Sequence, residues 1–301
     1  MNLMYREIPD ARTWTRIKQI HAGWSDDKKY YIQTNDGREL LLRLADISKY
    51  ERKKWEYESV RRLIHMDISM SRPVDFGICN EGRSVYILFT WVEGEDAREA
   101  IRRLGPLEQY RLGLKSGEIL RSLHEIPAQI QSLSWAERYN LKIDKYIANY
   151  RTCGIHFKGA EQILNYIEAH RYLLESRPVT FQHGDYHLGN MVVSGSGELG
   201  IIDFNRLDDG DPWEEFNRIT WCAKESAEFA SGRIHGYFQD EVPESFFKLM
   251  ALYIACNQIA SVPWAIPYGE AEVKYMLEQA EQVLAWYHGF ETSVPSWYLP
   301  S

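Results

Sequence analysis

The chain has 301 residues, a formal net charge of −8 and 45% hydrophobic residues. This length and apolar content allow a large core in one domain or two. The excess of acids disfavours general binding to nucleic acid. The longest apolar run, residues 249–262, is interrupted by Asn257 and Gln258 and predicts a buried helix rather than a membrane span. Four widely spaced cysteines indicate neither a zinc ribbon nor a disulfide framework, so we expect reduced thiols in a cytoplasmic protein without a membrane partner.

The N-terminal third of the chain is predicted to form a five-stranded sheet with one main helix. Short runs of β-favouring residues alternate with turn signals, of which Asn35-Asp36-Gly37 is the strongest. A helix capped by Asp46 is predicted over residues 46–65. The predicted strands cover residues 17–20, 29–34, 39–44, 72–78 and 85–91.

The remainder is predicted to be mainly helical. Amphipathic patterns and helix-ending signals, such as Pro127 after the first of these segments, support this interpretation. Trp264 is expected in a loop between the last two helices, where it would offer a platform to a substrate. The predicted helices cover residues 107–124, 141–150, 160–174, 213–229, 243–260 and 270–288.

The chemistry is concentrated in residues 179–216, where short apolar runs end beside acids or amides. Asp185 and Asn190 lie five positions apart across a loop, and a Ser-Gly-Ser-Gly turn predicts a hairpin that leads into Asp203. Pairing of this hairpin would bring Asn190 and Asp203 to the same end. Two hard oxygen ligands with a carboxylate close by suit Mg²⁺, and Asp185 is then left to orient a hydroxyl nucleophile.

These motifs resemble the catalytic loop and metal aspartate of protein kinases and, more closely, the aminoglycoside phosphotransferase and choline kinase-like families. The pattern H-G-D-x-x-x-x-N, then I-D-F, then G-D-P is met by His183-Gly184-Asp185 with Asn190 and by residues 202–204 and 210–212. The resemblance implies an α+β, bilobal protein kinase-like fold. It would have a five-stranded antiparallel nucleotide-binding lobe over residues 1–92 and a mainly helical catalytic and substrate-binding lobe over residues 93–301.

The resemblance also implies an enzyme, a kinase that moves the γ-phosphoryl group of ATP or GTP to a hydroxyl of a small molecule with Mg²⁺. Asp185 would accept or orient the hydroxyl proton, and His187 would donate to the transferring phosphoryl group. Asn190 and Asp203 would hold Mg²⁺ on the nucleotide phosphates. The loop itself would be braced by side chains flanking it, His183 through hydrogen bonds and Asp211 through backbone N–H groups.

Nucleotide-binding residues are implied by their positions. Gly23 and Ser25 lie in the loop between the first two strands, where backbone N–H groups and the serine hydroxyl would cradle phosphates. Arg43 stands where the resemblance expects a phosphate-pairing lysine; it keeps the charge but is bulkier. Glu56 is its expected acidic partner, because it shares a helix face with apolar residues, and Glu58 is the second candidate. The adenine edge is expected to bond to two backbone groups at the hinge, the Thr90 carbonyl and the Val92 N–H.

The acceptor is inferred from charge. If the acids that follow Asp203 face the cleft, they favour a polycationic hydroxyl compound, for which an aminoglycoside is the first candidate. If they are helix-terminal or surface acids, they have no such role. A macrolide, a choline-like amino alcohol or a sugar metabolite remains open as acceptor. The acids proposed to bind substrate are Asp208, Asp209 and Glu214.

Two hypotheses from other classes remain. Arg43 in place of lysine is compatible with a pseudokinase that binds nucleotide without turnover, although the presence of Asp185 with both metal residues argues for an enzyme. Alternatively, His183, Asp185 and His187 form an H-x-D-x-H site of a metal-dependent hydrolase. The sequence is compatible with a monomer or a homodimer.

Overall fold

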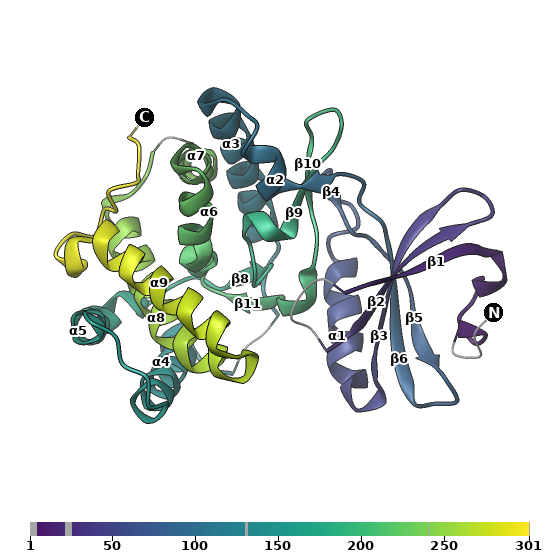
Figure 1. Cartoon of the computed structure of the whole chain (residues 1–301), viewed down its shortest axis with the longest axis horizontal. Helices are drawn as coiled ribbons and strands as arrows, with labels where there is room; N and C mark the ends of the chain where they lie inside the picture. The colour runs from purple at the N-terminus through teal and green to yellow at the C-terminus, as the bar shows by residue number, and fades with distance from the viewer. Residues whose placement is uncertain (1–4, 22–25, 130–131, 240, 301) are drawn as a thin grey trace. The chain divides into compact units, whose positions relative to one another are not determined.

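The computed structural model describes residues 5–21, 26–129, 132–239 and 241–300, and the chain divides into two compact units (Figure 1). The first unit comprises Met1–Asp96 and Asn190–Leu207, and the second comprises Ala97–Gly189 and Asp208–Ser301. The division therefore differs from the expected one at residue 92 in two ways. The first unit extends to Asp96, and it includes the segment with Asn190 and Asp203, which we had assigned to the second lobe.

A five-stranded antiparallel sheet forms the body of the first unit, as predicted. Its strand order is β1-β2-β3-β6-β5, and every neighbouring pair is antiparallel. β1, β2 and β3 are one to three residues longer than predicted, because ladder pairing continues beyond the most apolar positions, whereas β5 and β6 have the predicted length and are shifted by one residue. Their bounds are β1 Trp14–Ile20, β2 Lys28–Thr34, β3 Glu39–Asp46, β5 Pro73–Cys79 and β6 Ser84–Thr90.

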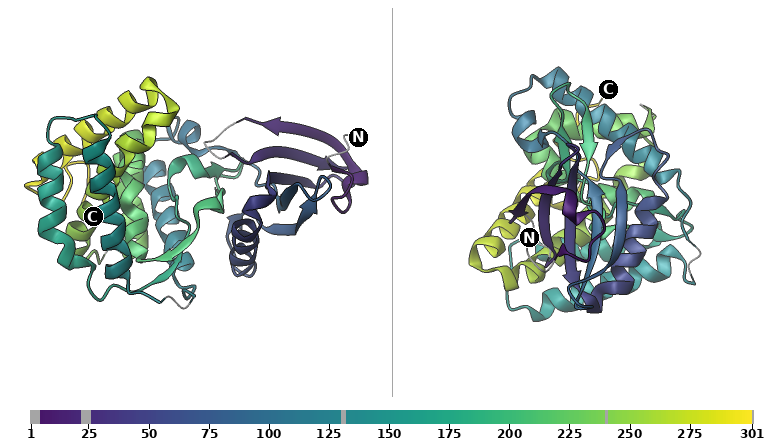
Figure 2. Two further views of the ribbon diagram at one scale, coloured as in Figure 1. Left: turned by 90° about the horizontal axis from the view of Figure 1, so that it is seen from below. Right: turned by 90° about the vertical axis from the view of Figure 1, so that its right-hand side faces the viewer.

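The two faces of this sheet have different roles. Leu40, Leu42 and Leu44 alternate along β3 and enter a buried core, each stabilising the fold by about 1.5–3 kcal/mol. Arg43 points to the opposite face, where α1 (Tyr50–Arg61) packs against β5 and β6 (Figures 1 and 2). The predicted helix over residues 46–65 is shorter in the structure, because Asp46 caps a preceding 3-10 turn through the Ser48 N–H.

A second, small sheet ties residues 190–207 into the first unit. Its order is β4-β10-β9-β7, with bounds Ser69–Met70, Leu199–Ile201, Met191–Val193 and Glu95–Asp96. The predicted hairpin is confirmed, since β9 and β10 pair antiparallel with Ile201 opposite Met191. The Ile202 N–H donates to the Asn190 carbonyl at 3.0 Å. Asn190 and the residues leading to Asp203 thus lie at the same end of the hairpin.

The second unit is mainly helical, as predicted, with a two-stranded sheet of β8 (Thr180–Gln182) and β11 (Asp208–Gly210). The long apolar helix α8 packs against α4, α5 and α9 and is mostly buried. By length and composition alone α8 could also cross a membrane, but its burial fits the predicted core helix. The other helices are α2 Ala97–Ile101, α3 Pro106–His124, α4 Trp135–Thr152, α5 Ala160–His170, α6 Ile219–Glu225, α7 Ala227–Phe238, α8 Glu244–Ala265 and α9 Glu270–Trp286.

Glycines allow α3 and α7 to cross with their backbones in contact. A Cβ at Gly236 would lie 2.0 Å from the Leu114 carbonyl oxygen, and one at Gly117 would lie 2.2 Å from the Arg233 carbonyl oxygen. Both helices carry two glycines four residues apart, which places them on one helix face. This glycine spacing is visible in the sequence and is a signal for close helix packing. The four glycines are Gly113, Gly117, Gly232 and Gly236.

Two helix predictions were wrong. The single helix expected over residues 213–229 is a 3-10 segment followed by α6 and the start of α7, because Ser226 is extended and caps α7 through the Phe229 N–H. Trp264 does not lie in a loop, because α8 continues through Pro263 to Ala265. Its ring lies 4.8 Å from that of Tyr268.

Candidate active site

Arg43 is the centre of a buried ionic network in the first unit. Its Nε and one terminal nitrogen donate to Asp27 Oδ2 at 3.2 and 2.9 Å, and the other terminal nitrogen donates to Asp203 Oδ1 at 2.7 Å. The predicted pairing with Glu56 is present as an ion pair of 3.7 Å. Lys53, one turn before Glu56 on α1, donates to Glu56 at 2.7 Å and also to Asp27. Arginine thus occupies the expected position and is held by three carboxylates.

Asp203 receives a second cation from the neighbouring strand. Lys29 Nζ lies 3.2 Å from Asp203 Oδ2, and the Asp203 side chain is 24% exposed. Burial alone would raise the pKa of Asp203, but Arg43 and Lys29 hold that pKa below its usual value, so the carboxylate is ionised near neutral pH. The backbone of Asp203 is left-handed, with φ 66° and ψ 60°. A conformation of this kind costs about 1–3 kcal/mol in a non-glycine residue and is typical of functional sites.

The donor set at the end of the hairpin fits Mg²⁺. Asp203 supplies an ionised carboxylate and Asn190 an amide oxygen, and both are hard oxygen ligands. Two protein ligands suffice for this ion, because it prefers to keep waters and bind substrate phosphates. Lys29 and Arg43 both lie beside Asp203. Their positive charges would partly neutralise an anionic ligand that binds next to this carboxylate.

Asp185 lies in the second unit, in the loop after β8. Its carboxylate oxygen Oδ1 is 3.0 Å from Arg218 Nε and 3.4 Å from His187 Nε2, and the side chain is 16% exposed. Its backbone N–H donates to His183 Nδ1 at 3.2 Å, which supports the bracing role predicted for His183. An arginine and a histidine therefore flank the carboxylate that the sequence singled out as the catalytic group.

The protonation of His187 follows from its contacts. Burial lowers the pKa of His187 and the neighbouring Asp185 only partly offsets this, so the ring is neutral near pH 7. Its Nδ1 accepts a hydrogen bond from the Gly189 N–H at 3.1 Å, so the proton of the neutral ring is on Nε2, the atom that faces Asp185. The ring packs edge-on against Trp221 at 4.9 Å. The neutral His187 ring therefore presents its Nε2–H to Asp185.

Glu215, rather than Asp211, fixes the backbone of the catalytic loop. Glu215 is 3% exposed and accepts hydrogen bonds from the N–H groups of His183 at 2.6 Å and Gly184 at 2.8 Å. The expectation for Asp211 was wrong, because its carboxylate is occupied by Arg177, Tyr253 and the Trp213 N–H. Asp211 thus stabilises the segment that carries Glu215.

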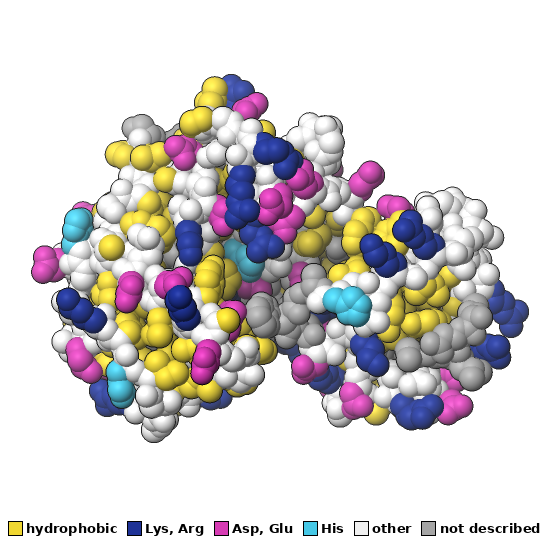
Figure 3. All heavy atoms as spheres, in the orientation of Figure 1, with side chains coloured by type: hydrophobic (Ala, Val, Ile, Leu, Met, Phe, Trp, Pro, Cys, Tyr) yellow, Lys and Arg dark blue, Asp and Glu magenta, His cyan; other side chains and the backbone are white. Residues whose placement is uncertain are grey.

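The acids proposed to bind an acceptor do not form one exposed surface. Asp208 is exposed, but Asp209 is 2% exposed and accepts a hydrogen bond from the Gln129 N–H at 3.0 Å. Glu214 is also buried and forms an ion pair of 3.2 Å with Lys142. Asp209 pairs with Phe181 across β11 and β8, and its carboxylate is buried within the second unit. Figure 3 shows acidic and basic side chains interspersed on the face it presents.

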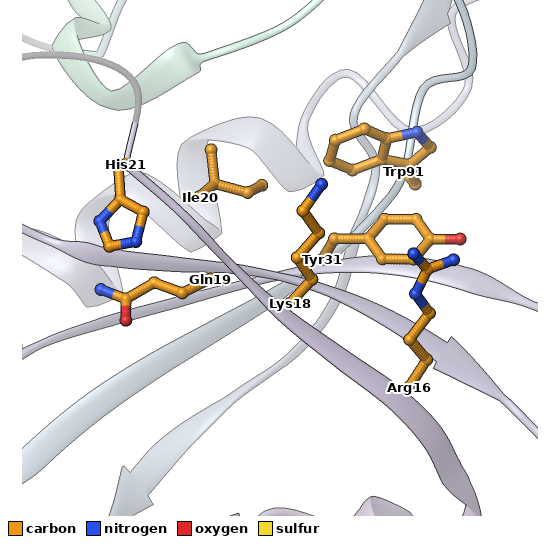
Figure 4. A pocket seen from close by; sticks show the side chains of 7 residues that line it. All are labelled: Arg16, Lys18, Gln19, Ile20, His21, Tyr31 and Trp91. Carbon is orange, nitrogen blue, oxygen red and sulfur yellow. The ribbon is translucent and has the colours of Figure 1, made fainter.

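An open pocket of about 460 Å³ lies on the first unit beside β1 and β2. Tyr31 and Trp91 meet edge-to-face with ring centroids 5.1 Å apart, and the guanidinium of Arg16 lies 6.0 Å from the Tyr31 ring. In Figure 4 the Lys18 side chain extends between Trp91 and Tyr31. Tyr31 and Lys29 are two residues apart on β2, so they point to the same face of the sheet. The pocket is lined by Arg16, Lys18, Gln19, Ile20, His21, Tyr31 and Trp91.

The remaining predicted positions are those proposed to bind the nucleotide and those of the hydrolase metal site. Gly23 and Ser25 lie outside the described residues. Thr90 ends β6 and its N–H donates to the Arg72 carbonyl at 2.8 Å, while Val92 is half-buried just beyond the strand. Among the described residues, no group of three or more His, Cys, Asp or Glu is arranged to hold a metal ion. The hydrolase hypothesis therefore lacks its ligand cluster within those residues.

The model of the phosphotransferase enzyme family matches residues 16–247, which include Asp203 of the first unit and Asp185 of the second. The chain belongs to the phosphotransferase enzyme family. The prediction of an enzyme that transfers phosphoryl groups is thereby confirmed. The chain is also 26% identical over 217 residues to an aminoglycoside 3'-phosphotransferase of Niallia circulans, with 70% of this chain and 80% of that protein covered.

Solved phosphotransferase structures share the fold. A GDP complex of a mutant aminoglycoside 2'-phosphotransferase matches with a TM-score of 0.72 at 14% identity, covering 96% of this chain and 97% of the other. A gentamicin complex of a second aminoglycoside phosphotransferase matches with a TM-score of 0.63 at 17% identity, covering 90% and 91%. The predicted α+β kinase-like fold is confirmed by these matches together with the five-stranded sheet and the helical second unit.

The sequence analysis missed several residues of this phosphotransferase. Lys29 faces Arg43 directly across β2 and β3, and this register could have been counted from the Asn35-Asp36-Gly37 turn. Lys53 and Glu56 are three apart on one helix, a spacing typical of ion pairs. Glu215 is one of several acids that follow Asp203 in the sequence, and its inward position carries no local signal.

Proposed function

We propose that this phosphotransferase moves the γ-phosphoryl group of a nucleoside triphosphate to a hydroxyl of a cationic small molecule, an aminoglycoside in the first instance, with Mg²⁺ as the metal. The observation that supports this most strongly is the hairpin that brings Asn190 and the ionised Asp203 to one end. Arg43 and Lys29 also flank Asp203. Their positive charge suits a site for a metal–polyphosphate complex, in which cations neutralise the phosphate charge.

The nucleotide is proposed to bind the first unit. Tyr31 and Trp91 supply aromatic walls suited to a base, and Arg16 and Lys18 supply positive charge near it. The backbone contacts proposed for the base are still the Thr90 carbonyl and the Val92 N–H, with Gly23 and Ser25 at the phosphates. Solved relatives of low identity carry ADP, GDP or AMP-PNP, which agrees with nucleotide use and leaves ATP and GTP both open.

Asp185 is proposed to orient the acceptor hydroxyl and receive its proton. Arg218 and His187 flank this carboxylate at 3.0 and 3.4 Å, and these contacts help to fix its position. A neutral His187 with its proton on Nε2 is able to donate a hydrogen bond, either to Asp185 or, as we propose for the reacting complex, to the transferring phosphoryl group. Asn190 and Asp203 would hold Mg²⁺, which neutralises charge on the phosphates.

The acceptor proposal rests on the relatives and on charge. The relative from Niallia circulans is named as an aminoglycoside phosphotransferase, and complexes of distant structural relatives contain hygromycin B, gentamicin or kanamycin. The net charge of −8 favours a cationic ligand. Exposed Asp208 remains a proposed contact, together with Trp264, whereas Asp209 and Glu214 are both buried and engaged within the second unit.

The cellular compartment of the enzyme is proposed from the state of its cysteines. The four thiols, Cys79, Cys153, Cys222 and Cys256, are all free. Free thiols are typical of a reducing compartment, so we propose that the enzyme acts in the cytoplasm. A monomer or a homodimer remains our prediction for its assembly.

Incubation of the enzyme with Mg²⁺ and either ATP or GTP against a panel of acceptors tests the proposed function. The panel contains aminoglycosides, macrolides, choline-like amino alcohols and sugars, and product phosphorylation is followed by mass spectrometry. Phosphorylation of an aminoglycoside supports the proposal. Phosphorylation of another class alone would redirect the acceptor assignment, and nucleotide binding without any product would favour the pseudokinase hypothesis.

A further inference from the structure

The position of Arg43 raises the question of which cation contacts the nucleotide phosphates. All three guanidinium nitrogens of Arg43 are committed to carboxylates, and the side chain is only 3% exposed. Moving it toward a phosphate would remove two of the donors to Oδ2 of buried Asp27. Separating a buried ion pair in this way is strongly unfavourable. Arg43 is therefore built into the fold and is poorly placed to follow a ligand.

Lys29 is the cation beside Asp203 that remains adaptable. It pairs with Arg43 in register across β2 and β3, so both side chains project from the same face of the sheet. Its Nζ lies 3.2 Å from Asp203 Oδ2, and its side chain is 13% exposed against 3% for Arg43. A lysine ammonium is a compact charge on a flexible stem with three donors. It is thus able to keep Asp203 as one partner and bind a phosphate oxygen with another donor.

The charges of the network agree with a buried, fixed Arg43 and a more exposed, adaptable Lys29. Three carboxylates, Asp27, Glu56 and Asp203, are matched by three cations, Arg43, Lys53 and Lys29. Lys53 is 7% exposed and lies between Asp27 and Glu56, so it belongs to the buried part with Arg43. Lys29 is the most exposed of these three cations, and it contacts the carboxylate proposed to bind the metal.

We propose that Lys29 on β2 is the residue that binds the nucleotide phosphates in this chain, and that Arg43 on β3 is a positioning residue that holds Asp27 and Asp203. This inference rests on the proposed function, since it names a residue of the same nucleotide site. It explains how the chain retains a phosphate-binding lysine although arginine stands at the position where the resemblance expects one.

Calorimetric titration of Lys29→Gln with ATP, ADP and AMP tests this inference, both with Mg²⁺ and with a chelator in its place. A charge-assisted hydrogen bond to phosphate predicts a loss of about 10- to 100-fold in ATP affinity. The loss should persist without metal, should shrink for AMP, and should be largely reversed in Lys29→Arg. Lys28→Gln is the matched control, because Lys28 is exposed on the other face of the same strand and should leave ATP affinity unchanged.

A second measurement on the unaltered enzyme covers the case in which Lys29→Gln does not fold. Acylation of lysines is followed by peptide mass spectrometry, and ATP should protect Lys29 but not Lys28. Unchanged ATP affinity in a folded Lys29→Gln variant, or equal acylation of Lys29 with and without ATP, overturns the inference while the proposed function stands. If the unaltered enzyme binds neither ATP nor GTP, the proposed function fails and the inference fails with it.

Discussion

Glu215 supports the loop that carries Asp185, and Glu215→Gln isolates that support. The glutamate oxygens accept the N–H groups of His183 at 2.6 Å and Gly184 at 2.8 Å. A glutamine has the same shape but only one acceptor oxygen, so its NH₂ group faces one of these buried N–H donors. The variant should therefore lose one anchor of the loop and leave one backbone donor unsatisfied.

The expected magnitude follows from these contacts. A hydrogen bond to a charged group contributes about 1.5–3 kcal/mol, and an unsatisfied buried donor costs about 1–3 kcal/mol. The two contributions overlap, so we expect the free energy of unfolding to fall by about 2–4 kcal/mol. We also expect kcat to fall because Asp185 is displaced, while ATP affinity, which residues of the first unit provide in our proposal, stays unchanged.

Urea unfolding followed by circular dichroism measures the stability change, and steady-state kinetics measure kcat. Glu118→Gln is the matched control, since the ion pair of Glu118 with Lys115 joins two side chains that are at least half exposed, and such pairs contribute about 1 kcal/mol or less. Equal stability losses in the two variants, or an unchanged kcat in Glu215→Gln, would refute the assignment of Glu215 as the loop anchor.

The pH dependence provides a second test of Glu215. Burial opposes its ionisation, but the hydrogen bonds and charges around it, including His124 and His183, hold the pKa of Glu215 below its usual value. A lowered pKa in the folded state stabilises the fold above the unfolded pKa of about 4.3, and this stabilisation is lost as the pH falls through the folded value. The unaltered protein should lose stability below about pH 4 more steeply than Glu215→Gln.

Three further predictions follow from the structure. Asp185→Asn should lower kcat by about 10²–10⁴-fold and leave ATP affinity unchanged, as measured by phosphotransfer kinetics and calorimetry; an equal loss of ATP affinity would contradict its role. Asp203→Asn should abolish the gain in ATP affinity that Mg²⁺ provides, and a retained Mg²⁺ effect in calorimetry would exclude Asp203 as a ligand. Gly236→Ala should lower the free energy of unfolding by at least about 1–3 kcal/mol, because its Cβ would meet the α3 backbone. The control Gly195→Ala, in an open turn, should have little effect in the same urea titration.

Local patterns in the sequence predicted the sheet and the catalytic hairpin. The Asn35-Asp36-Gly37 turn sufficed to predict the hairpin of β2 and β3, because turn type acts over a few residues. The Ser-Gly-Ser-Gly turn likewise placed Asn190 at the end of the hairpin that leads to Asp203. Each of these predictions depends only on neighbouring residues.

Contacts between distant segments were not predictable in the same way. Glu215 reaches His183 from 32 positions away, and Lys29 reaches Asp203 from 174 positions away. Asp209 is buried and accepts a hydrogen bond from the Gln129 N–H, which is 80 positions away in the sequence. Such contacts depend on how strands and loops pack in three dimensions, and a single sequence contains no local signal for them.

The most direct test of the central claim is mass spectrometry of an aminoglycoside such as kanamycin after incubation with the enzyme, Mg²⁺ and a nucleoside triphosphate. The account predicts a product heavier by one phosphoryl group, formed by the unaltered enzyme and essentially absent with Asp185→Asn. An unmodified acceptor in every reaction of the panel, or a product that Asp185→Asn forms at the same rate, would contradict it.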